Sequence, residues 1–269
     1  MIIFPEIDPV ACSLGFLEVR WYGICYFLGF LGAYALCLYR RDIPELHWEK
    51  LLVADLLIYV ALGVIFGGSI GYWLLYQPQA LLETPWQLLA FWEPGRAFHG
   101  GLIGVLIAVA LFCRKSHFRF FEVTDFIAPA VPIGLGMGRL GNFINGELWG
   151  RTTELPWGMV FPQGGILARH PSQLYEFLLE GVVLCAALVI YGRKPRPAGS
   201  ISGWFLVGYA VFRMAVECVR EPDWHQGFVA FDWVTMGQLL SLPMLLLGAF
   251  LIYWAPRQAR SATCARISI

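Results

Sequence analysis

The chain of 269 residues is 58% hydrophobic and only 14% charged. Soluble domains contain roughly 45–50% apolar and about 25% charged residues, so this composition indicates a membrane protein. The formal net charge is zero, and the sequence shows no basic stripe, zinc finger or RNA-binding motif, which argues against a nucleic-acid partner.

Seven segments are apolar and long enough to predict membrane-spanning helices, each of which needs about 20 largely apolar residues. In chain order they are residues 17–39, 51–76, 99–113, 123–139, 172–191, 201–218 and 233–254. Pro129 and Pro132 predict a kink in the fourth. The expected fold is therefore all-α, with residues 1–269 forming a single seven-helix membrane domain.

Basic residues predict the orientation of these spans. Twelve of the 19 Lys and Arg residues, including all three lysines, follow the first, third, fifth and seventh spans in short clusters. Clustered basic residues mark cytoplasmic connections. We therefore expect the N-terminus outside and the C-terminus in the cytoplasm.

Two long connections then fall on the outer side. Residues 77–98, with Trp86 and Trp92, are expected to form an interfacial amphipathic arm. Residues 142–171 are rich in Gly and Pro and are expected to form a small extramembrane head with turns and short strands. At its end, in "HPSQLYE", Ser172 is expected to cap the next helix.

Polar residues near the span ends all fall at the outer boundary in this topology. They are Tyr22, His99, Arg139, Asn142, His170, Gln173, Tyr175, Glu176, Tyr209, Arg213 and Glu217. This convergence predicts one polar chamber on the outer face. Glu180 lies deeper in its span, and the sequence suggests no role for it.

Tyr209, Arg213 and Glu217 are spaced i, i+4 and i+8, which places them on one helical face. An arginine at the bilayer centre costs at least about 2.5–3.5 kcal/mol, so Arg213 should face a cavity or a partner. One interpretation is a self-contained Arg213–Glu217 ion pair. Another is that Glu217 orients Arg213 toward a phosphate or carboxylate, which a guanidinium binds through two parallel hydrogen bonds.

His99 precedes Gly100 and Gly101 at the start of a predicted helix. Glycines allow close backbone approach to a ligand, and a helix N-terminus favours anions. An imidazole with an ordinary pKa near 6.5 suits proton transfer at neutral pH. A histidine in such a position also serves often as a structural hydrogen-bonding group, and both interpretations stay open here.

Several motifs together resemble one family. "GRLGNFINGE" at residues 138–147 resembles the signature of the bacterial prolipoprotein diacylglyceryl transferases, and "HGGLIG", "HPSQLYE" and "RMAVECVREPD" follow the same order. The resemblance covers essentially the whole chain. It departs before His99, where this sequence reads "PGRAF" and a serine expected from the family pattern is missing.

The resemblance implies transfer of the diacylglyceryl group of phosphatidylglycerol to the lipobox cysteine of preprolipoproteins. The expected place is the outer, periplasmic face of the bacterial inner membrane, and no metal or cofactor is implied. It implies that His99, Arg139 and Arg213 are catalytic. Residues expected to help bind phosphatidylglycerol, with the two arginines, are Tyr22, Gly100, Gly101, Asn142, Glu147, Tyr209 and Glu217. Residues expected to support the site are His170, Gln173, Tyr175 and Glu176.

Two other classes of function are less consistent with the sequence. An anion channel or transporter would need polar residues continuing to the cytoplasmic face, whereas here they stop at the outer side. An intramembrane hydrolase would need a Ser–His pairing or an HExxH motif, and neither is convincing. The seven cysteines lack paired metal spacing, and most lie in apolar runs, so we expect neither a disulfide framework nor a zinc site.

Overall fold

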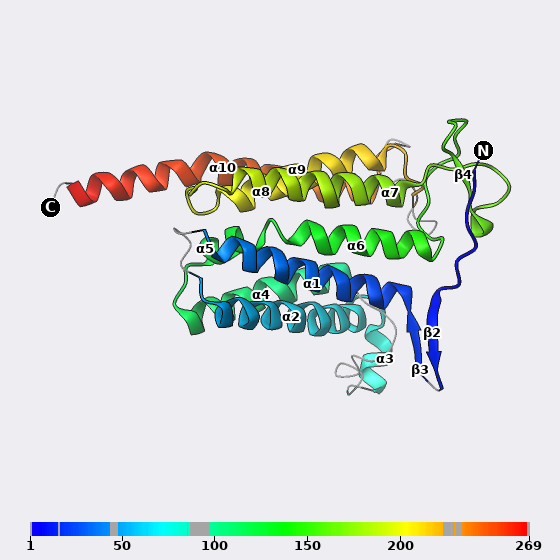
Figure 1. Cartoon of the computed structure of the whole chain (residues 1–269), viewed down its shortest axis with the longest axis horizontal. Helices are drawn as coiled ribbons and strands as arrows, with labels where there is room; N and C mark the ends of the chain where they lie inside the picture. The colour runs from blue at the N-terminus through cyan, green and yellow to red at the C-terminus, as the bar shows by residue number, and fades with distance from the viewer. Residues whose placement is uncertain are drawn as a thin grey trace. The chain divides into compact units, whose positions relative to one another are not determined.

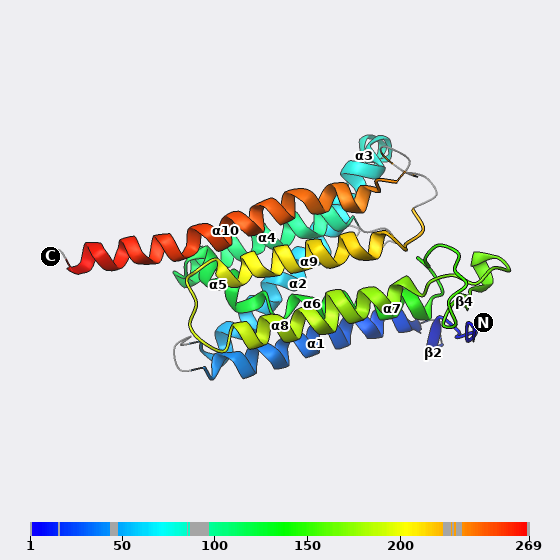
Figure 2. The ribbon, with the colours of Figure 1, turned by 90° about the horizontal axis from the view of Figure 1, so that it is seen from above.

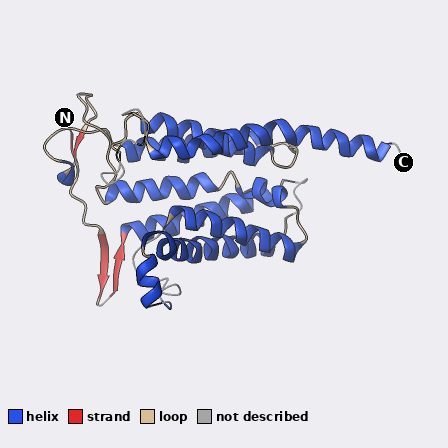
Figure 3. Cartoon of the chain, turned by 180° about the vertical axis from the view of Figure 1, so that it is seen from behind, coloured by secondary structure: helices blue, strands red, loops and turns tan. Residues whose placement is uncertain are grey.

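The computed structural model describes residues 2–15, 17–43, 48–84, 86, 97–222, 227, 229 and 233–267. Helices dominate this part of the chain, and the strands form two small sheets (Figure 3). The chain forms two compact units, residues 1–36 with 127–269, and residues 37–126. The boundaries fall inside helix α1 (Trp21–Arg41) and at the end of helix α5 (Phe120–Ile127).

The unit of residues 37–126 contains α2 (Lys50–Tyr76), α3 (Pro78–Glu83), α4 (Phe98–Ser116) and most of α5. Helices α2 and α4 pack through facing glycines at every fourth position. A Cβ added to any of these glycines would lie within 3 Å of the partner backbone. Small residues let helices approach closely in membranes, where apolar side chains gain little by leaving lipid. The glycines are Gly63, Gly67 and Gly71 in α2 and Gly100 and Gly104 in α4.

Aromatic rings and one buried arginine hold α5 in this unit. The Trp48 ring stacks on those of Phe118 and Phe126, with centroids 4.6 and 4.0 Å away. Arg40 is only 1% exposed. Its Nε donates to the carbonyl of Phe126 at 3.2 Å, and its Nη2 donates to that of Asp125 at 3.4 Å. These contacts secure the start of the unit against α5.

The other unit contains most of α1 together with the helices after residue 130. They are α6 (Val131–Ile144), α7 (Ser172–Glu176), the π-helix η3 (Phe177–Val183), α8 (Leu184–Tyr191), α9 (Ser200–Glu217) and α10 (Met236–Ile267). Helices α7, η3 and α8 form one continuous rod (Figure 1). Glycines again set the close approaches, with Gly136 of α6 against Gly181 of η3, and Gly203 of α9 against Gly248 of α10. Figure 2 shows α9 and α10 side by side.

The strands form two separate two-stranded sheets, one of which includes a strand of the predicted head. Strand β1 (Ile2–Ile3) pairs in parallel with β4 (Met159–Val160), and β2 (Val10–Leu14) pairs antiparallel with β3 (Leu17–Arg20). Residues 17–20 are thus a strand, and the prediction that a helix begins at residue 17 is wrong. Hydropathy alone does not separate an apolar strand from the start of an apolar helix. In the predicted head, a 3₁₀ turn at Pro162–Gly164 follows β4.

Within the described residues, five helical stretches are long and apolar enough to cross a membrane, namely α1, α2, α4, the α7–η3–α8 rod and α10. The α5–α6 pair makes a sixth if it is counted as one broken span. The break between α5 and α6 contains Pro129, and Pro132 is the second residue of α6, where a missing N–H costs nothing. The chain is therefore a helical membrane protein.

Only part of the predicted arm is described. Helix α3 occupies its start, and Trp86 is 68% exposed. Trp92 lies outside the described residues, as does Arg96 of the departing motif.

Candidate active site

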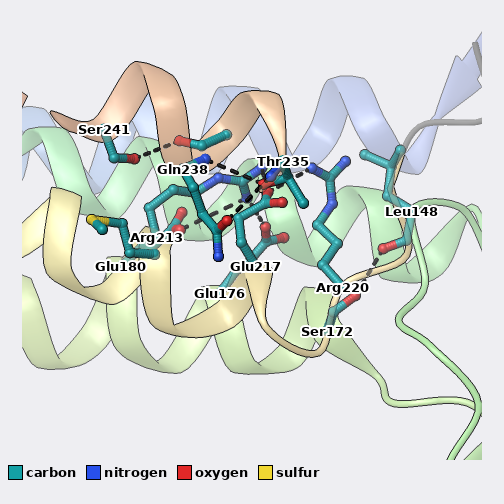
Figure 4. A network of polar contacts seen from close by, with 12 residues as sticks. Leu148, Ser172, Glu176, Glu180, Arg213, Glu217, Arg220, Thr235, Gln238 and Ser241 are labelled. Carbon is teal, nitrogen blue, oxygen red and sulfur yellow. Dashed lines mark hydrogen bonds and ion pairs between the residues drawn. The ribbon is translucent and has the colours of Figure 1, made fainter. Parts of the chain in front are cut away.

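Six buried or nearly buried charged side chains meet inside the unit that contains α6, α7, η3 and α9. We call them the charge network: Arg139, Arg213, Arg220, Glu176, Glu180 and Glu217. They come from α6, the α7–η3 rod, α9 and the turn after α9. Figure 4 shows those of the α7–η3 rod, of α9 and of the turn after α9. The network holds three positive and three negative groups, so its formal charges cancel when all six are ionised.

Glu176 joins the two arginines that the sequence singled out. It is 0% exposed. One of its carboxylate oxygens forms a short ion pair with Nη1 of Arg213, and the other lies 3.3 Å from Nε of Arg139. Two guanidiniums from motifs more than 70 residues apart in sequence therefore share one carboxylate. Glu176, expected only to support the site, lies at its centre.

The Arg213–Glu217 ion pair is present, through Nη2 of Arg213. It is not self-contained, because Glu217 also accepts a hydrogen bond from Nη1 of Arg220 at 3.1 Å and one from the Thr235 hydroxyl. The first of the two interpretations of Arg213 is thus incomplete: Glu217 joins the arginine to a larger network.

The start of α10 closes this end of the network. Thr235 and Gln238 form a reciprocal cap, with the backbone N–H of each donating to the other side chain at 3.1 and 3.2 Å. Gly237 lies against Glu217, and a Cβ there would come within 2.7 Å of the carboxylate carbon. Only glycine leaves room at this position for the carboxylate to reach both arginines.

The signature loop is held by its own side chains. Asn142 and Asn145 both donate to Oε1 of Glu147, at 2.9 and 3.2 Å. Gln173 donates to the Glu147 carbonyl at 2.6 Å. Gly146 has φ +66°, a conformation that glycine adopts without strain. Glu147 and Asn142 therefore order the loop directly after α6.

Ser172 is the first residue of α7, not its cap: Pro171 holds that position, and no side chain caps the helix. The Ser172 hydroxyl instead donates to the carbonyl of Leu148 at 2.9 Å. Leu148 has φ +60°, which turns the signature loop over the helix start. The capping prediction is wrong because Ser172 lies one residue inside the helix and its hydroxyl donates to the signature loop instead.

Tyr22, the second residue of α1, lies on the backbone of α6. A Cβ added to Gly141 would meet the Tyr22 ring at 2.8 Å. The hydroxyl of Tyr22 is 3.2 Å from that of Tyr26. Tyr22 is thus in place beside the signature. Tyr209, 8% exposed, lies one turn before Arg213 in α9, within electrostatic range of both Arg139 and Arg213.

His170 and Tyr175 line an apolar pocket of about 380 Å³, whose lining includes no member of the charge network. Nδ1 of His170 is 3.2 Å from the Tyr175 hydroxyl, which also accepts a hydrogen bond from Nε1 of Trp157 at 2.8 Å. Burial lowers the pKa of His170 below its ordinary 6.5, so the imidazole favours its neutral form. This trio fixes the head to the start of α7.

His99, Gly100 and Gly101 belong to the other compact unit. His99 is the second residue of α4. Gly100 contacts the backbone of α2, whereas a Cβ on Gly101 would meet only one atom, 3.7 Å away. Of the two glycines, Gly100 has a structural reason to lack a side chain.

Sequence reasoning missed two members of the network. Glu180 follows Gln173 and Glu176 at i+7 and i+4, and this shared helical face was the available signal. Arg220 was not expected at the site, yet it pairs with Glu217. Arg151 was not expected at the site either, and its Nε donates to the Arg220 carbonyl at 3.0 Å. It thus connects the head to the turn after α9.

No group of three or more His, Cys, Asp or Glu residues in the described ranges could hold a metal ion. The site as described can offer buried guanidinium and carboxylate groups beside an ordered loop. Such a set can hold an oxyanion and stabilise charge that develops on it.

Comparisons with known proteins agree with this chemistry. The prolipoprotein diacylglyceryl transferase family matches residues 9–254. The chain is 54% identical to the phosphatidylglycerol–prolipoprotein diacylglyceryl transferase of Legionella pneumophila strain Philadelphia 1, over 96% of this chain and 100% of that protein. It is 52% identical to the protein of the same name from Coxiella burnetii strain RSA 331, over 96% and 98% of the two chains.

Proposed function

The chain belongs to the prolipoprotein diacylglyceryl transferase family, and from this premise we propose that it transfers the diacylglyceryl group of phosphatidylglycerol to the lipobox cysteine of preprolipoproteins. The products are a thioether-linked lipid and glycerol phosphate, and the step is the first in lipoprotein maturation. The observation that carries this proposal is the meeting of Arg139 and Arg213 at Glu176, which supplies two buried guanidiniums for one phosphate.

The phosphate is bound by Arg139 and Arg213. In the described chain, Arg139 contacts carboxylates through Nε and Nη2 only, and its side chain is 20% exposed. Its Nη1 is therefore available to a phosphate oxygen. Arg213 is held by Glu176 and Glu217 on either side, which fixes its guanidinium plane. Preorganised cations of this kind stabilise the charge that grows on a leaving phosphate.

The bond changes are a simple displacement. The cysteine sulfur forms a bond to the glycerol carbon that carries the phosphate, and the bond from that carbon to the phosphate oxygen breaks. The electron pair stays on glycerol phosphate, where Arg139 and Arg213 balance it. A free thiol with a pKa of about 8.5 is mostly protonated at neutral pH, so a base must accept its proton.

His99 is proposed as that base. It begins α4 and stands in the glycine-flanked motif that the family resemblance points to. The signature loop, ordered by Asn142 and Glu147, holds the lipid head group with Tyr22, Tyr209, Glu217, Gly100 and Gly101. His170, Gln173, Tyr175 and Glu176 support it. Binding, proton transfer and charge stabilisation are enough for the reaction, so no metal or cofactor is invoked.

The proposed topology has seven spans in one membrane domain, with the N-terminus outside and the C-terminus in the cytoplasm of a bacterial cell. The α5–α6 pair counts as one span and α9 as another. The positively charged clusters support this orientation. In this topology the charge network belongs to the outer face of the inner membrane, where both membrane-bound substrates reach it from within the bilayer.

The direct test gives the purified protein phosphatidylglycerol and a peptide that carries a lipobox cysteine. Mass spectrometry should detect the peptide with a diacylglyceryl thioether, together with released glycerol phosphate. A peptide with serine in place of that cysteine is the control and should stay unmodified. If the cysteine peptide also stays unmodified, the proposal fails.

A further inference from the structure

Glu180 differs from the other two carboxylates of the charge network in how it is held. Glu176 and Glu217 each accept a hydrogen bond from an arginine. Glu180 is 0% exposed, and neither of its oxygens has a hydrogen-bond donor in the described chain. Its nearest cationic nitrogens, on Arg139 and Arg213, are 3.7 and 3.9 Å away. Glu180 is thus attracted to the arginines without being bonded to them.

The charged and phenolic groups around Glu180 come from α6, from α9, from the turn after α9 and from its own rod. Helix α6 contributes Arg139, α9 contributes Tyr209 and Arg213, and the turn after α9 contributes Arg220. Along its own rod, Glu176 lies one turn earlier, and α8 carries no charged residue. Glu180 therefore faces three cations, one phenol hydroxyl and one like-charged neighbour.

Lipid binding upsets the balance of charge in this network. Three arginines and three glutamates cancel while all are ionised, and a phosphodiester brings one more negative charge. An uncompensated charge in a buried site is costly, so a carboxylate must leave or become neutral. Glu180 is 0% exposed in the middle of a helical rod, so its side chain cannot leave the network. Neutralising Glu176 or Glu217 would weaken hydrogen bonds to Arg213 or Arg220, whereas neutralising Glu180 forfeits none.

We propose that Glu180 takes up a proton from the outer aqueous phase when the phosphate of phosphatidylglycerol binds to Arg139 and Arg213. The lipid phosphate then replaces the charge of Glu180 beside the two guanidiniums. Glu180 acts as a positioning residue, because the neutral acid no longer draws the arginines away from the phosphate. This inference rests on the proposed function and adds to it a coupling between lipid binding and protonation.

Proton uptake is measured by calorimetric titration of the detergent-solubilised protein with phosphatidylglycerol in two buffers of different ionisation enthalpy. At about pH 8, binding should take up close to one proton per lipid. Diacylglycerol, which lacks the phosphate, should cause no uptake. Equal heats in both buffers with phosphatidylglycerol would overturn the proposal, as would equal uptake with diacylglycerol.

The Glu180→Gln variant mimics the neutral acid. Its Kd and KM for phosphatidylglycerol should be independent of pH and, at about pH 8, lower than those of the wild type. In the wild type both should rise by up to about tenfold per pH unit above the midpoint of the transition. Glu154→Gln, which removes an exposed glutamate of the head, is the matched control and should behave like the wild type.

The outcomes separate this inference from the proposed function. A wild-type protein that forms no thioether refutes the transferase itself, whatever its proton uptake. A wild-type protein that forms the thioether but binds the lipid without a proton refutes only the role of Glu180. That role is also refuted if Glu180→Gln keeps the wild-type pH dependence. If that variant does not fold, the wild-type calorimetry decides alone.

Discussion

Replacement of Arg213 by lysine tests whether the guanidinium fork, and not merely a positive charge, is needed. Arg213 contacts Glu176 through Nη1 and Glu217 through Nη2, so it bridges two carboxylates at once. The single nitrogen of lysine satisfies one of them at a time and offers no second donor to a phosphate. The other carboxylate then stays buried without its main partner.

The size of the effect follows from these contacts. A hydrogen bond to a charged group contributes about 1.5–3 kcal/mol, so Arg213→Lys should lower the free energy of unfolding by that amount. Losing one donor to the developing phosphate charge costs about 2.7–4 kcal/mol in the transition state. We therefore expect kcat/KM to fall about 10²–10³-fold, measured as thioether formation on a lipobox peptide.

Arg40→Lys is the matched control, because Arg40 is also buried but donates to the backbone carbonyls of Phe126 and Asp125. It should lower the thermal unfolding midpoint in a similar way while kcat/KM stays within about threefold of wild type, since no group of the charge network is lost. If Arg213→Lys keeps more than about a tenth of the wild-type kcat/KM, the two-donor argument is wrong.

Three further predictions concern the remaining parts of the chain. His99→Gln should lower kcat by at least about 10²-fold at wild-type protein levels, and near-normal turnover would rule out the base. Gly100→Ala places a Cβ against the Gly67 carbonyl oxygen and 2.7 Å from Cα of Gly71, both in the α2 backbone. It should destabilise the protein by about 1–3 kcal/mol through overpacking. Gly101→Ala, with its nearest atom 3.7 Å away, should unfold at the wild-type temperature, and equal midpoints for both variants would contradict the packing. Because burial lowers the pKa of His170 from 6.5, the unfolded chain binds a proton there more readily than the folded one. The neutral His170 therefore contributes to the free energy of unfolding above about pH 6.5, and this contribution should be lost as the pH falls toward the lower pKa of the folded state. Between about pH 7.5 and 5.5, the free energy of unfolding should change less steeply with pH in His170→Gln than in the wild type. An identical pH dependence in the variant would contradict the role of His170.

The sequence predicted the parts of the site that local patterns encode. Helical spacing placed Arg213 and Glu217 on one face, and the ion pair between them is present. The meeting of Arg139 with Arg213 could not be predicted from spacing, because it depends on how α6 packs against the α7–η3 rod at Gly136 and Gly181. Such contacts join residues distant in the chain.

The misses have identifiable physical causes. Glu180 stands in an apolar run, and the mean hydropathy of such a run changes little when it contains a single carboxylate. Arg220 follows a span, where basic residues are common, and only the folded structure shows its ion pair with Glu217. Ser172 follows the usual pattern of a cap, but its acceptor is a carbonyl that the left-handed Leu148 presents from a different part of the chain.

The ion pairs between α9 and the α7–η3 rod also have a consequence for the insertion of the chain into the membrane. Helix α9 is not among the helices apolar enough to cross unaided, and it carries Arg213 and Glu217. Each such charge costs about 2.5–3.5 kcal/mol in a lone helix at the bilayer centre. Glu176 and Glu180 lie in the preceding rod and neutralise Arg213 once α9 packs beside it. In the proposed topology, we therefore expect the rod and α9 to enter the membrane as a pair, which brings Arg213 and Glu176 together in the same step.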